Sequence, residues 1–262
     1  MFYLKYSLNE SHFVISVKRA IQILRLYTPN RIELGIKEIA NLLDLSTSTV
    51  HRYVKELEQE GFLIQNPFTK QYRLGFSVIS LGGIIQSHQE IYEEANPILE
   101  NLANRFHLPA HICVMENNRV IYLLRAMGDA PTKLITKRGR FNDVHCTAEG
   151  LAILAFKSNP VIEDIIYQPL REYTPYTITD PQELKTLIHQ VRYDRFSITQ
   201  DMFALGYISL AVPIQNYSGE VVSSLALIGD TNQIKEIQYE EVISELKNGA
   251  KEISMMLGYY ED

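Results

Sequence analysis

Two stretches of apolar residues at helical spacing meet near the start of this chain. Residues 35–65 contain both, separated by a break of about four residues. The first stretch has one apolar face, made by Ile36, Ile39, Ala40 and Leu43. The second has another, made by Val50, Val54 and Leu57, and Leu45 lies at the corner between them. Ser46 can cap the second helix, because its hydroxyl can accept from a free backbone amide of the first turn. The pattern predicts two helices joined by a tight turn.

The polar side of the second helix carries short hydroxyl groups and cations, which suit phosphate oxygens and base edges. The candidate DNA-binding residues of this segment are Ser46, Thr47, Ser48, Thr49, His51, Arg52 and Lys55. Lys55 is equally well placed to pair with Glu58 or Gln59 on its own helix. A tight helix pair with a cationic second helix is typical of a helix-turn-helix, although an ordinary helical hairpin has the same pattern.

The residues that follow favour the DNA-binding interpretation. Gly61 stands where a left-handed helix C-cap is expected. Residues 62–65 and 71–74 are predicted strands, joined by a turn over residues 66–70 that contains Asn and Pro. A β-hairpin directly after the second helix is a wing, and its Lys70 and Arg73 can reach backbone phosphates.

Three further helices are predicted around this segment. The helix over 14–27 has Ser16 as its cap and a face made by Val17, Ala20, Ile21, Leu24 and Tyr27. The helix over 76–88 contains Gly82-Gly83, which weakens it by about 1 kcal/mol per glycine and makes the pair a candidate hinge. The helix over 91–106 has a strong apolar face.

Beyond residue 106, strands alternate with helices. Strands are expected over 110–116, 119–125, 132–136, 196–199, 207–214 and 221–229. Helices are expected over 147–156, 160–167, 180–194 and 239–257. Long hairpins combined with helices predict an α+β domain with a mainly antiparallel sheet. We expect an N-terminal arm over 1–12, a winged helix-turn-helix domain over 13–75, a linker helix over 76–90 and a second domain over 91–262.

Charge divides along the chain in the same way. The 262 residues carry a net charge of −6, but residues 13–75 hold nine Lys or Arg against six Asp or Glu. Residues 1–12 are neutral overall, so the remainder carries −9. A basic first domain followed by an acidic second one fits a DNA-binding module joined to another function. The two cysteines and the lack of a long apolar stretch indicate a cytoplasmic protein that makes no membrane contact.

Two pairs of residues could carry other chemistry. His111 and Cys113 alternate along a predicted strand, and His145 adjoins Cys146 ahead of a helix. Zinc needs about four ligands that converge, and a nucleophilic cysteine needs a base with an orienting group. Neither arrangement is recognisable, so we expect no metal, no cofactor and no enzymatic activity.

Five stretches of this chain, in this order and spacing, resemble IclR-type transcriptional regulators. They are residues 16–20, 48–52, 72–75, 145–150 and 173–180, which together cover nearly the whole chain. The resemblance implies a winged helix-turn-helix, a linker helix and a GAF-like α+β domain that binds a small metabolite effector. It also implies a homodimer or tetramer that binds double-stranded DNA.

The resemblance further implies an effector pocket between the sheet and the loop that enters the helix at Thr147. Its residues would be His145, Thr147, Ala148, Glu149, Thr199, Asp201, Tyr207, Ser209, Ala226 and Ile228. Glu149 stands where the family has a small residue, and Thr199-Gln200-Asp201-Met202 has one carboxylate where the family has an acidic cluster. An acidic Glu149 predicts a ligand that is neutral or partly cationic, or that is bound through hydroxyls.

The sequence therefore predicts a DNA-binding transcription regulator whose operator binding is modulated by a small molecule. The alternative is a ligand-binding sensor that acts through protein partners and uses the helical N-terminal domain for dimerisation. Salt dependence separates the two, because only phosphate contacts give an affinity that falls steeply with salt.

Overall fold

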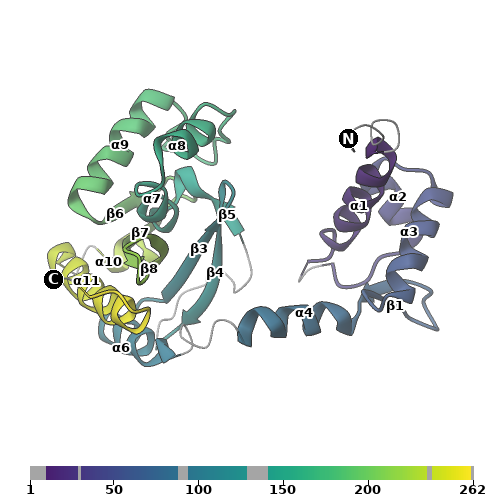
Figure 1. The fold of residues 1–262 in the computed structure, drawn as a ribbon, viewed down its shortest axis with the longest axis horizontal. Coiled ribbons are helices and arrows are strands. Elements are labelled where there is room, and N and C mark those ends of the chain that lie inside the picture. The colour runs from purple at the N-terminus through teal and green to yellow at the C-terminus, as the bar shows by residue number, and fades with distance from the viewer. Residues whose placement is uncertain (1–9, 29–30, 88–93, 129–140, 235–237, 261–262) are drawn as a thin grey trace, which may run out of the picture. The chain divides into compact units, whose positions relative to one another are not determined.

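The computed structural model describes residues 10–28, 31–87, 94–128, 141–234 and 238–260. The chain divides into two compact units, Met1–His88 and Gln89–Asp262. Both are drawn in Figure 1. The predicted α+β fold, with an N-terminal helix-turn-helix and a C-terminal antiparallel sheet, is confirmed. Among the described residues, no helix is both long enough and apolar enough to cross a lipid bilayer.

The first unit is a group of helices with a small hairpin. Its elements are α1 (Glu10–Leu24), α2 (Ile36–Leu43), α3 (Thr47–Gln59), β1 (Leu63–Gln65), β2 (Tyr72–Leu74) and α4 (Phe76–Ser87). The apolar faces predicted for the helix pair meet in one core, where Ile39, Val50 and Val54 are fully buried beside Leu63 and Tyr72. Burying each large aliphatic side chain stabilises such a core by about 1.5–3 kcal/mol.

The prediction for the first helix is wrong in three details. Glu10 already belongs to α1, so the end of the predicted arm is helical, and Ser16 lies inside the helix and does not cap it. Val17 and Ile21 are 62% and 44% exposed, whereas Ile23 is fully buried. Spacing alone finds an apolar stripe, but which part of that stripe meets α3 depends on how the two helices cross.

The second unit is built on one six-stranded sheet. Its strands are β3 (Ala110–Glu116), β4 (Arg119–Ala126), β5 (Phe141–Asp143), β6 (Ser197–Gln200), β7 (Tyr207–Gln215) and β8 (Val221–Asp230). They lie in the order β5-β4-β3-β8-β7-β6, and every neighbouring pair is antiparallel. The helical elements are α6 (Asn96–Phe106), η1 (Val144–Cys146), α7 (Ala148–Leu154), α8 (Asn159–Ile166), α9 (Pro181–Asp194), α10 (Thr231–Ile234) and α11 (Tyr239–Met256).

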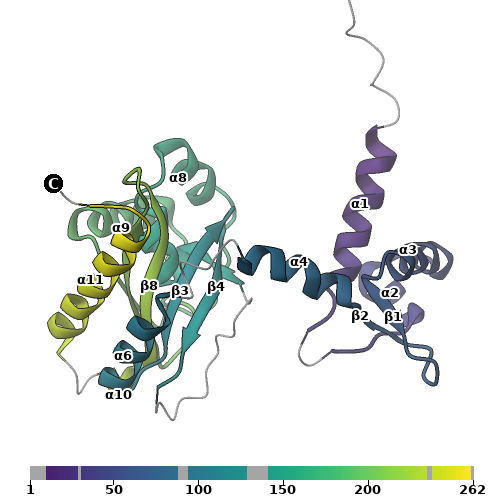
Figure 2. The same ribbon diagram turned by 60° about the horizontal axis from the view of Figure 1, so that its bottom comes forward.

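Helices cover both faces of this sheet (Figures 1 and 2). On one face α6 and α11 enclose a core with the side chains of Ile112, Leu210 and Leu225. On the other face α7 packs closely, since Ala148 and Ala152 meet Ala211 and Ala226 of the sheet. Small side chains at this contact let the helix backbone approach the strands. The α8 and α9 helices pack outside α7 in a further apolar cluster.

Most predicted elements of the second unit occur within one or two residues of their predicted ends. β5 and α10 were not predicted, because elements of three and four residues are too short to show a period. The helix predicted from Ile91 begins, as α6, at Asn96, with Pro97 in its first turn. The strand predicted over 132–136 lies outside the described residues.

Candidate functional site

The turn between α2 and α3 is held by the residues that the sequence singled out. Ser46 has extended backbone angles and its Oγ accepts a hydrogen bond from the Thr49 amide at 3.2 Å, as predicted for an N-cap. Asp44 ends α2 in the left-handed conformation. These two local features set where α3 begins and which of its sides faces away from the core.

The predicted DNA-binding residues of α3 fall mainly on its outer side. Ser46, Thr47, Ser48, His51 and Arg52 are exposed, and Thr49 is half-buried. The Lys55 Nζ lies 2.6 Å from Glu58 Oε2, which is the helix pairing that the sequence left open. Val50, Val54 and Leu57 bury the opposite side of the same helix. Hydroxyl and cationic groups are thus presented together on one exposed surface.

The wing follows directly and is fixed to the rest of the unit. β1 and β2 pair antiparallel, and the Leu34 and Tyr72 backbones exchange two hydrogen bonds of 2.9 and 2.8 Å. At the turn, Asn66 Oδ1 accepts from the Phe68 amide at 3.0 Å. Lys70 is exposed and adopts a φ of 59°, and Arg73 is exposed on β2. Both predicted phosphate contacts are therefore open to solvent.

In the second unit, a small cavity of about 30 Å³ lies beside the start of α7. Six of the predicted effector residues line it, namely Thr147, Glu149, Thr199, Tyr207, Ser209 and Ile228. They come from the helix start and from β6, β7 and β8, so the fold brings together positions about eighty residues apart. A cavity of this size has room for about one water molecule.

The polar centre of the cavity wall is the carboxylate of Glu149, which is 1% exposed. The Tyr122 hydroxyl donates to its Oε1 at 2.7 Å, and the Ser209 hydroxyl donates to its Oε2 at 2.8 Å. Asn142 Nδ2 in turn donates to the Tyr122 oxygen at 3.0 Å. No Lys, Arg or His lines the cavity in the part of the chain that the structure describes. Hydroxyl donors therefore satisfy this buried carboxylate without a cation beside it.

The other four predicted effector residues do not line this cavity. Ala148 and Ala226 are packed against each other between α7 and the sheet. The Asp201 Oδ1 accepts from the Gly206 amide at 2.6 Å and shapes the loop after β6. The His145 Nε2 lies 3.0 Å from the Arg171 carbonyl oxygen, and burial lowers the pKa of this histidine.

A segment from Tyr173 to Thr177 holds the loop that closes the cavity. The Thr174 hydroxyl donates to the Asp201 carbonyl and the Thr177 hydroxyl to the Met202 carbonyl, both at 2.6 Å. The rings of Tyr173 and Phe203 lie 5.0 Å apart. The stretch over residues 173–180, one of the five that resemble the family, therefore positions the loop over the candidate pocket.

Six residues that the sequence reasoning did not assign to the pocket also line it. They are Tyr122, Cys146, Met202, Phe203, Ala204 and Ile208. Tyr122 could have been found, because a hydroxyl in the otherwise apolar run of residues 120–124 needs a buried partner. The loop residues 202–204 carry no such signal, since a loop has no period that could orient its side chains.

Both cysteines have environments that disfavour the reactive thiolate. Burial raises the pKa of the Cys146 thiol, with Asp143 and Glu149 adding to the effect, so the thiolate nucleophile is disfavoured. Burial also raises the pKa of Cys113. Within the described ranges, no three His, Cys, Asp or Glu side chains are grouped so that they could hold a metal ion.

Comparison with known proteins matches both units to one family. Residues 16–67 match the IclR helix-turn-helix domain. Residues 84–255 match the bacterial transcriptional regulator IclR C-terminal domain, which is more than half of the chain.

Similar proteins align over nearly the full length. The HTH-type transcriptional regulator XynR of Escherichia coli is 27% identical over 93% of this chain and 97% of its own length. The regulator KdgR of Dickeya chrysanthemi is 24% identical over 95% of this chain and 81% of its own.

Two solved structures have the same fold. An IclR transcriptional regulator from Alicyclobacillus acidocaldarius superimposes with a TM-score of 0.80 at 25% identity, over 97% of this chain and all of that one. An IclR homologue from Microbacterium hydrocarbonoxydans, crystallised with 4-hydroxybenzoate, has a TM-score of 0.80 at 23% identity over 92% and 98% of the two chains. With a helix-turn-helix and wing in the first unit and family models that match both units, this chain belongs to the IclR family of bacterial transcriptional regulators.

Proposed function

We propose that this protein controls transcription by binding operator DNA through α3 and the wing, under the control of a small molecule in the cavity beside Glu149. The observation that carries the DNA-binding half is the exposed side of α3, where Ser46 to Ser48 adjoin His51 and Arg52. A bidentate contact from an arginine such as Arg52 to guanine is worth about 1–3 kcal/mol of discrimination. Lys70 and Arg73 would hold the wing on backbone phosphates.

A homodimer fits the charge and the exposed apolar surface of the first unit. The net charge of +3 on residues 13–75 is small for a DNA-binding surface, and a second copy doubles it. Two exposed apolar pairs lie outside the core of this unit. They are Val17 with Ile21 on α1, and Phe76 with Ile79 on α4, the latter 74% and 69% exposed. Exposed apolar groups of this kind are typical of an interface between subunits.

Footprinting on the region upstream of its own gene tests the DNA-binding proposal. Arg52→Ala should weaken protection at least tenfold, which corresponds to about 1.4 kcal/mol. The matched control is Lys185→Ala, which removes one cation from a half-buried site on α9 where it pairs with Glu163 of α8. Equal protection by the wild type and Arg52→Ala would contradict the assigned role of α3.

Salt dependence tests the alternative of a sensor that acts through protein partners. If α3 and the wing bind phosphates, the logarithm of affinity should fall linearly with the logarithm of salt, and Arg73→Ala should lower that slope by about one. An apolar protein interface has no such slope. A flat dependence together with retained dimerisation would favour the sensor.

The proposed effector is a neutral or cationic metabolite with hydroxyl or amine donors. The two carboxylate oxygens of Glu149 accept hydrogen bonds from the Tyr122 and Ser209 hydroxyls. Among the described residues, no cation lines the cavity. A carboxylate ligand brought beside Glu149 would place two like charges in a buried site without compensation. The 4-hydroxybenzoate of the Microbacterium homologue is an anion of this kind, so we expect this protein to discriminate against it.

Effector binding also requires the cavity to open. A volume of about 30 Å³ is far below the roughly 300–1,000 Å³ of a typical ligand pocket. The loop residues Met202 to Ala204 form one wall and are held by Thr174 and Thr177. A ligand that displaces this loop shifts the equilibrium from the closed toward the open arrangement. The size of the shift is set by the difference between the ligand's affinities for the closed and the open arrangement.

Calorimetric titration with matched probes tests the effector proposal. The wild type should bind 4-hydroxybenzamide more tightly than 4-hydroxybenzoate, and Glu149→Gln should reverse or abolish this preference. This conservative change keeps the side-chain volume, so we expect the variant to remain folded. Unchanged affinities for both probes in Glu149→Gln would contradict the role given to this carboxylate.

A further inference from the structure

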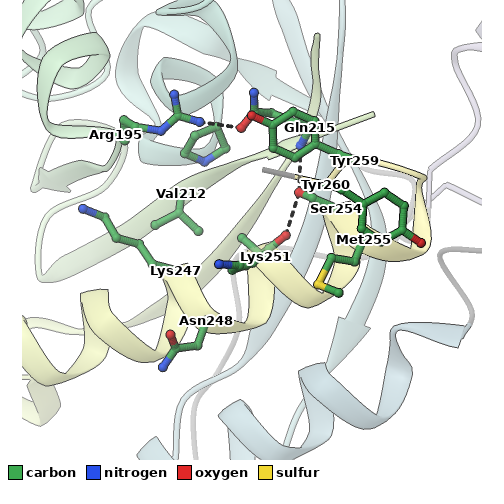
Figure 3. Close-up of a pocket in the computed structure, with 12 residues that line it drawn as sticks. Arg195, Val212, Gln215, Lys247, Asn248, Lys251, Ser254, Met255, Tyr259 and Tyr260 are labelled. Carbon is green, nitrogen blue, oxygen red and sulfur yellow. Dashed lines mark hydrogen bonds between the residues drawn. The ribbon is translucent and has the colours of Figure 1, made fainter. Parts of the chain in front are cut away.

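A second cavity beside the sheet of the second unit lies on the face opposite Glu149. It has a volume of about 410 Å³ and is bounded by strand β7, helix α11 and the corner that joins α9 to β6 (Figure 3). This volume falls within the range of small-molecule sites, unlike the cavity of about 30 Å³ beside Glu149. The two spaces are separated by the sheet, because even-numbered β7 residues such as Leu210 face α11 while Ala211 faces α7.

The register of the sheet explains why a space exists here. β6 begins at Ser197, which pairs with Ala211, so β7 continues past Ala211 without a β6 partner. Pro213 stands in this stretch, which pairs with β8 alone, and proline is tolerated at such an edge of a sheet. The end of the stretch is held by α11, since the Gln215 amide donates to Ser254 Oγ at 3.0 Å. The cavity therefore occupies the place that a longer β6 would fill.

Cationic side chains surround this cavity. Arg195, Lys247 and Lys251 all line it, and none of its described lining residues is acidic. Arg195 donates to the neutral side chain of Gln215, and Lys247 Nζ donates to the Asp194 backbone carbonyl at 3.0 Å. These acceptors orient the two cations without neutralising their charge. The second unit is acidic overall, so a cationic cavity in it runs against the average charge of its surroundings.

Aromatic and apolar groups complete the cavity. The Arg195 guanidinium carbon lies 5.3 Å from the centroid of the Phe156 ring, and Lys247 Nζ lies 5.1 Å from that of Phe196. These contacts restrict the positions of both charged groups. Val212 and Pro213 form an apolar wall, and Tyr259 and Tyr260 stand at the far end (Figure 3). A free phosphate would use only the cations, whereas a carboxylate with an apolar body would use both surfaces.

We propose that this cavity is a second ligand site, distinct from the one beside Glu149, and that it binds a small organic anion with an apolar or aromatic body. The carboxylate lies between Arg195 and Lys247, and the apolar body lies against Val212 and Pro213. The two sites then select opposite charges on the two faces of one sheet.

Methyl NMR on the full-length protein tests this proposal, because each cavity contains one methionine. Met255 lines the cationic cavity and Met202 lines the cavity beside Glu149. With ¹³C-methyl methionine labelling, and assignment by Met→Leu variants, benzoate should shift the Met255 signal in a saturable way and leave Met202 in place. Benzamide has the same shape without the charge. Its affinity, measured from the shift of the Met255 signal, should be at least about tenfold lower, because it cannot form charge-assisted hydrogen bonds.

Variants of the cations complete the test. Lys247→Gln and Arg195→Gln should each weaken benzoate binding, measured at the Met255 signal, about tenfold. Lys185→Gln, at a lysine that pairs with Glu163 of α8 and does not line the cavity, should leave the affinity unchanged. The wild-type Met202 signal in each variant shows that the unit is folded. Benzamide binding as tightly as benzoate, a response at Met202 only, or full affinity in both cavity variants would each overturn the proposal.

Discussion

The buried hydrogen bonds around Glu149 predict a large loss of stability from a very small change. Tyr122→Phe removes one hydroxyl group, which donates to Glu149 Oε1 and accepts from Asn142 Nδ2. Both partners are buried, with Glu149 1% and Asn142 4% exposed, so neither can turn to bulk water. The phenyl ring itself keeps its packing, and the change therefore isolates the polar contribution.

The magnitude follows from the two bonds. A hydrogen bond to a charged group contributes about 1.5–3 kcal/mol, and a buried amide left without its acceptor costs about 1–3 kcal/mol. Together these two contributions predict a fall of about 2.5–6 kcal/mol in the free energy of unfolding of the second unit. The lower end applies if a water enters the neighbouring cavity, whose volume of about 30 Å³ admits one.

Urea unfolding followed at the Met202 methyl signal measures this effect in the second unit alone, since a chain of two units need not unfold in one step. The matched control is Tyr193→Phe, because that hydroxyl belongs to a side chain that is 88% exposed. It should change stability by less than about 0.5 kcal/mol. The double variant Tyr122→Phe with Glu149→Gln should lose at least about 1 kcal/mol less than the sum of the single changes. A fall of under about 0.5 kcal/mol for Tyr122→Phe, or strict additivity, would refute the reasoning.

Three further predictions concern other parts of the chain. Ser46→Ala should destabilise the first unit by about 1 kcal/mol and weaken operator binding, whereas Ser46→Asp keeps the cap and the stability, as thermal unfolding would show. Gly150→Ala should destabilise the second unit by about 1–3 kcal/mol in urea, because the added Cβ would lie 2.5 Å from the Val144 Cα and carbonyl oxygen. Burial lowers the pKa of His111 to about 3 from 6.5, so the unfolded chain takes up a proton that the folded chain does not. Stability should therefore fall as pH drops below about 6.5, by up to about 1.4 kcal/mol per pH unit, and His111→Gln should reduce that slope between about pH 7 and about pH 5.

Local sequence signals predicted the DNA-binding unit well because its structure is mostly local. The Ser46 cap, the glycine after α3 and the hairpin of the wing each depend on a few neighbouring residues. The same reasoning misjudged α1, where Val17 and Ile21 are exposed and Ile23 is buried. The spacing of apolar residues was correct there, but the face that α3 covers is set by the crossing of two helices.

The candidate pocket was predicted in part, and the division has a physical cause. Thr147, Glu149, Thr199, Tyr207, Ser209 and Ile228 line the cavity beside α7, and they were assigned by resemblance to a family. The same resemblance also assigned Ala148 and Ala226, which pack between α7 and the sheet. Adjacent residues on a strand or at the start of a helix point their side chains in different directions. A list of motif residues therefore includes neighbours whose side chains point away from the cavity.

The sequence by itself determined the order of elements, the basic and acidic halves, and the residues that cap and end the helices, because these depend on neighbours along the chain. Only the tertiary structure decided which polar groups meet. Tyr122, Glu149 and Ser209 are joined across three elements, and Arg195 and Lys247 line one cavity beside the end of β7 that extends beyond β6. Such contacts follow from strand register and helix packing, which depend on the whole core at once. The chemistry of both cavities is therefore a property of the fold, although every group in it was visible in the sequence.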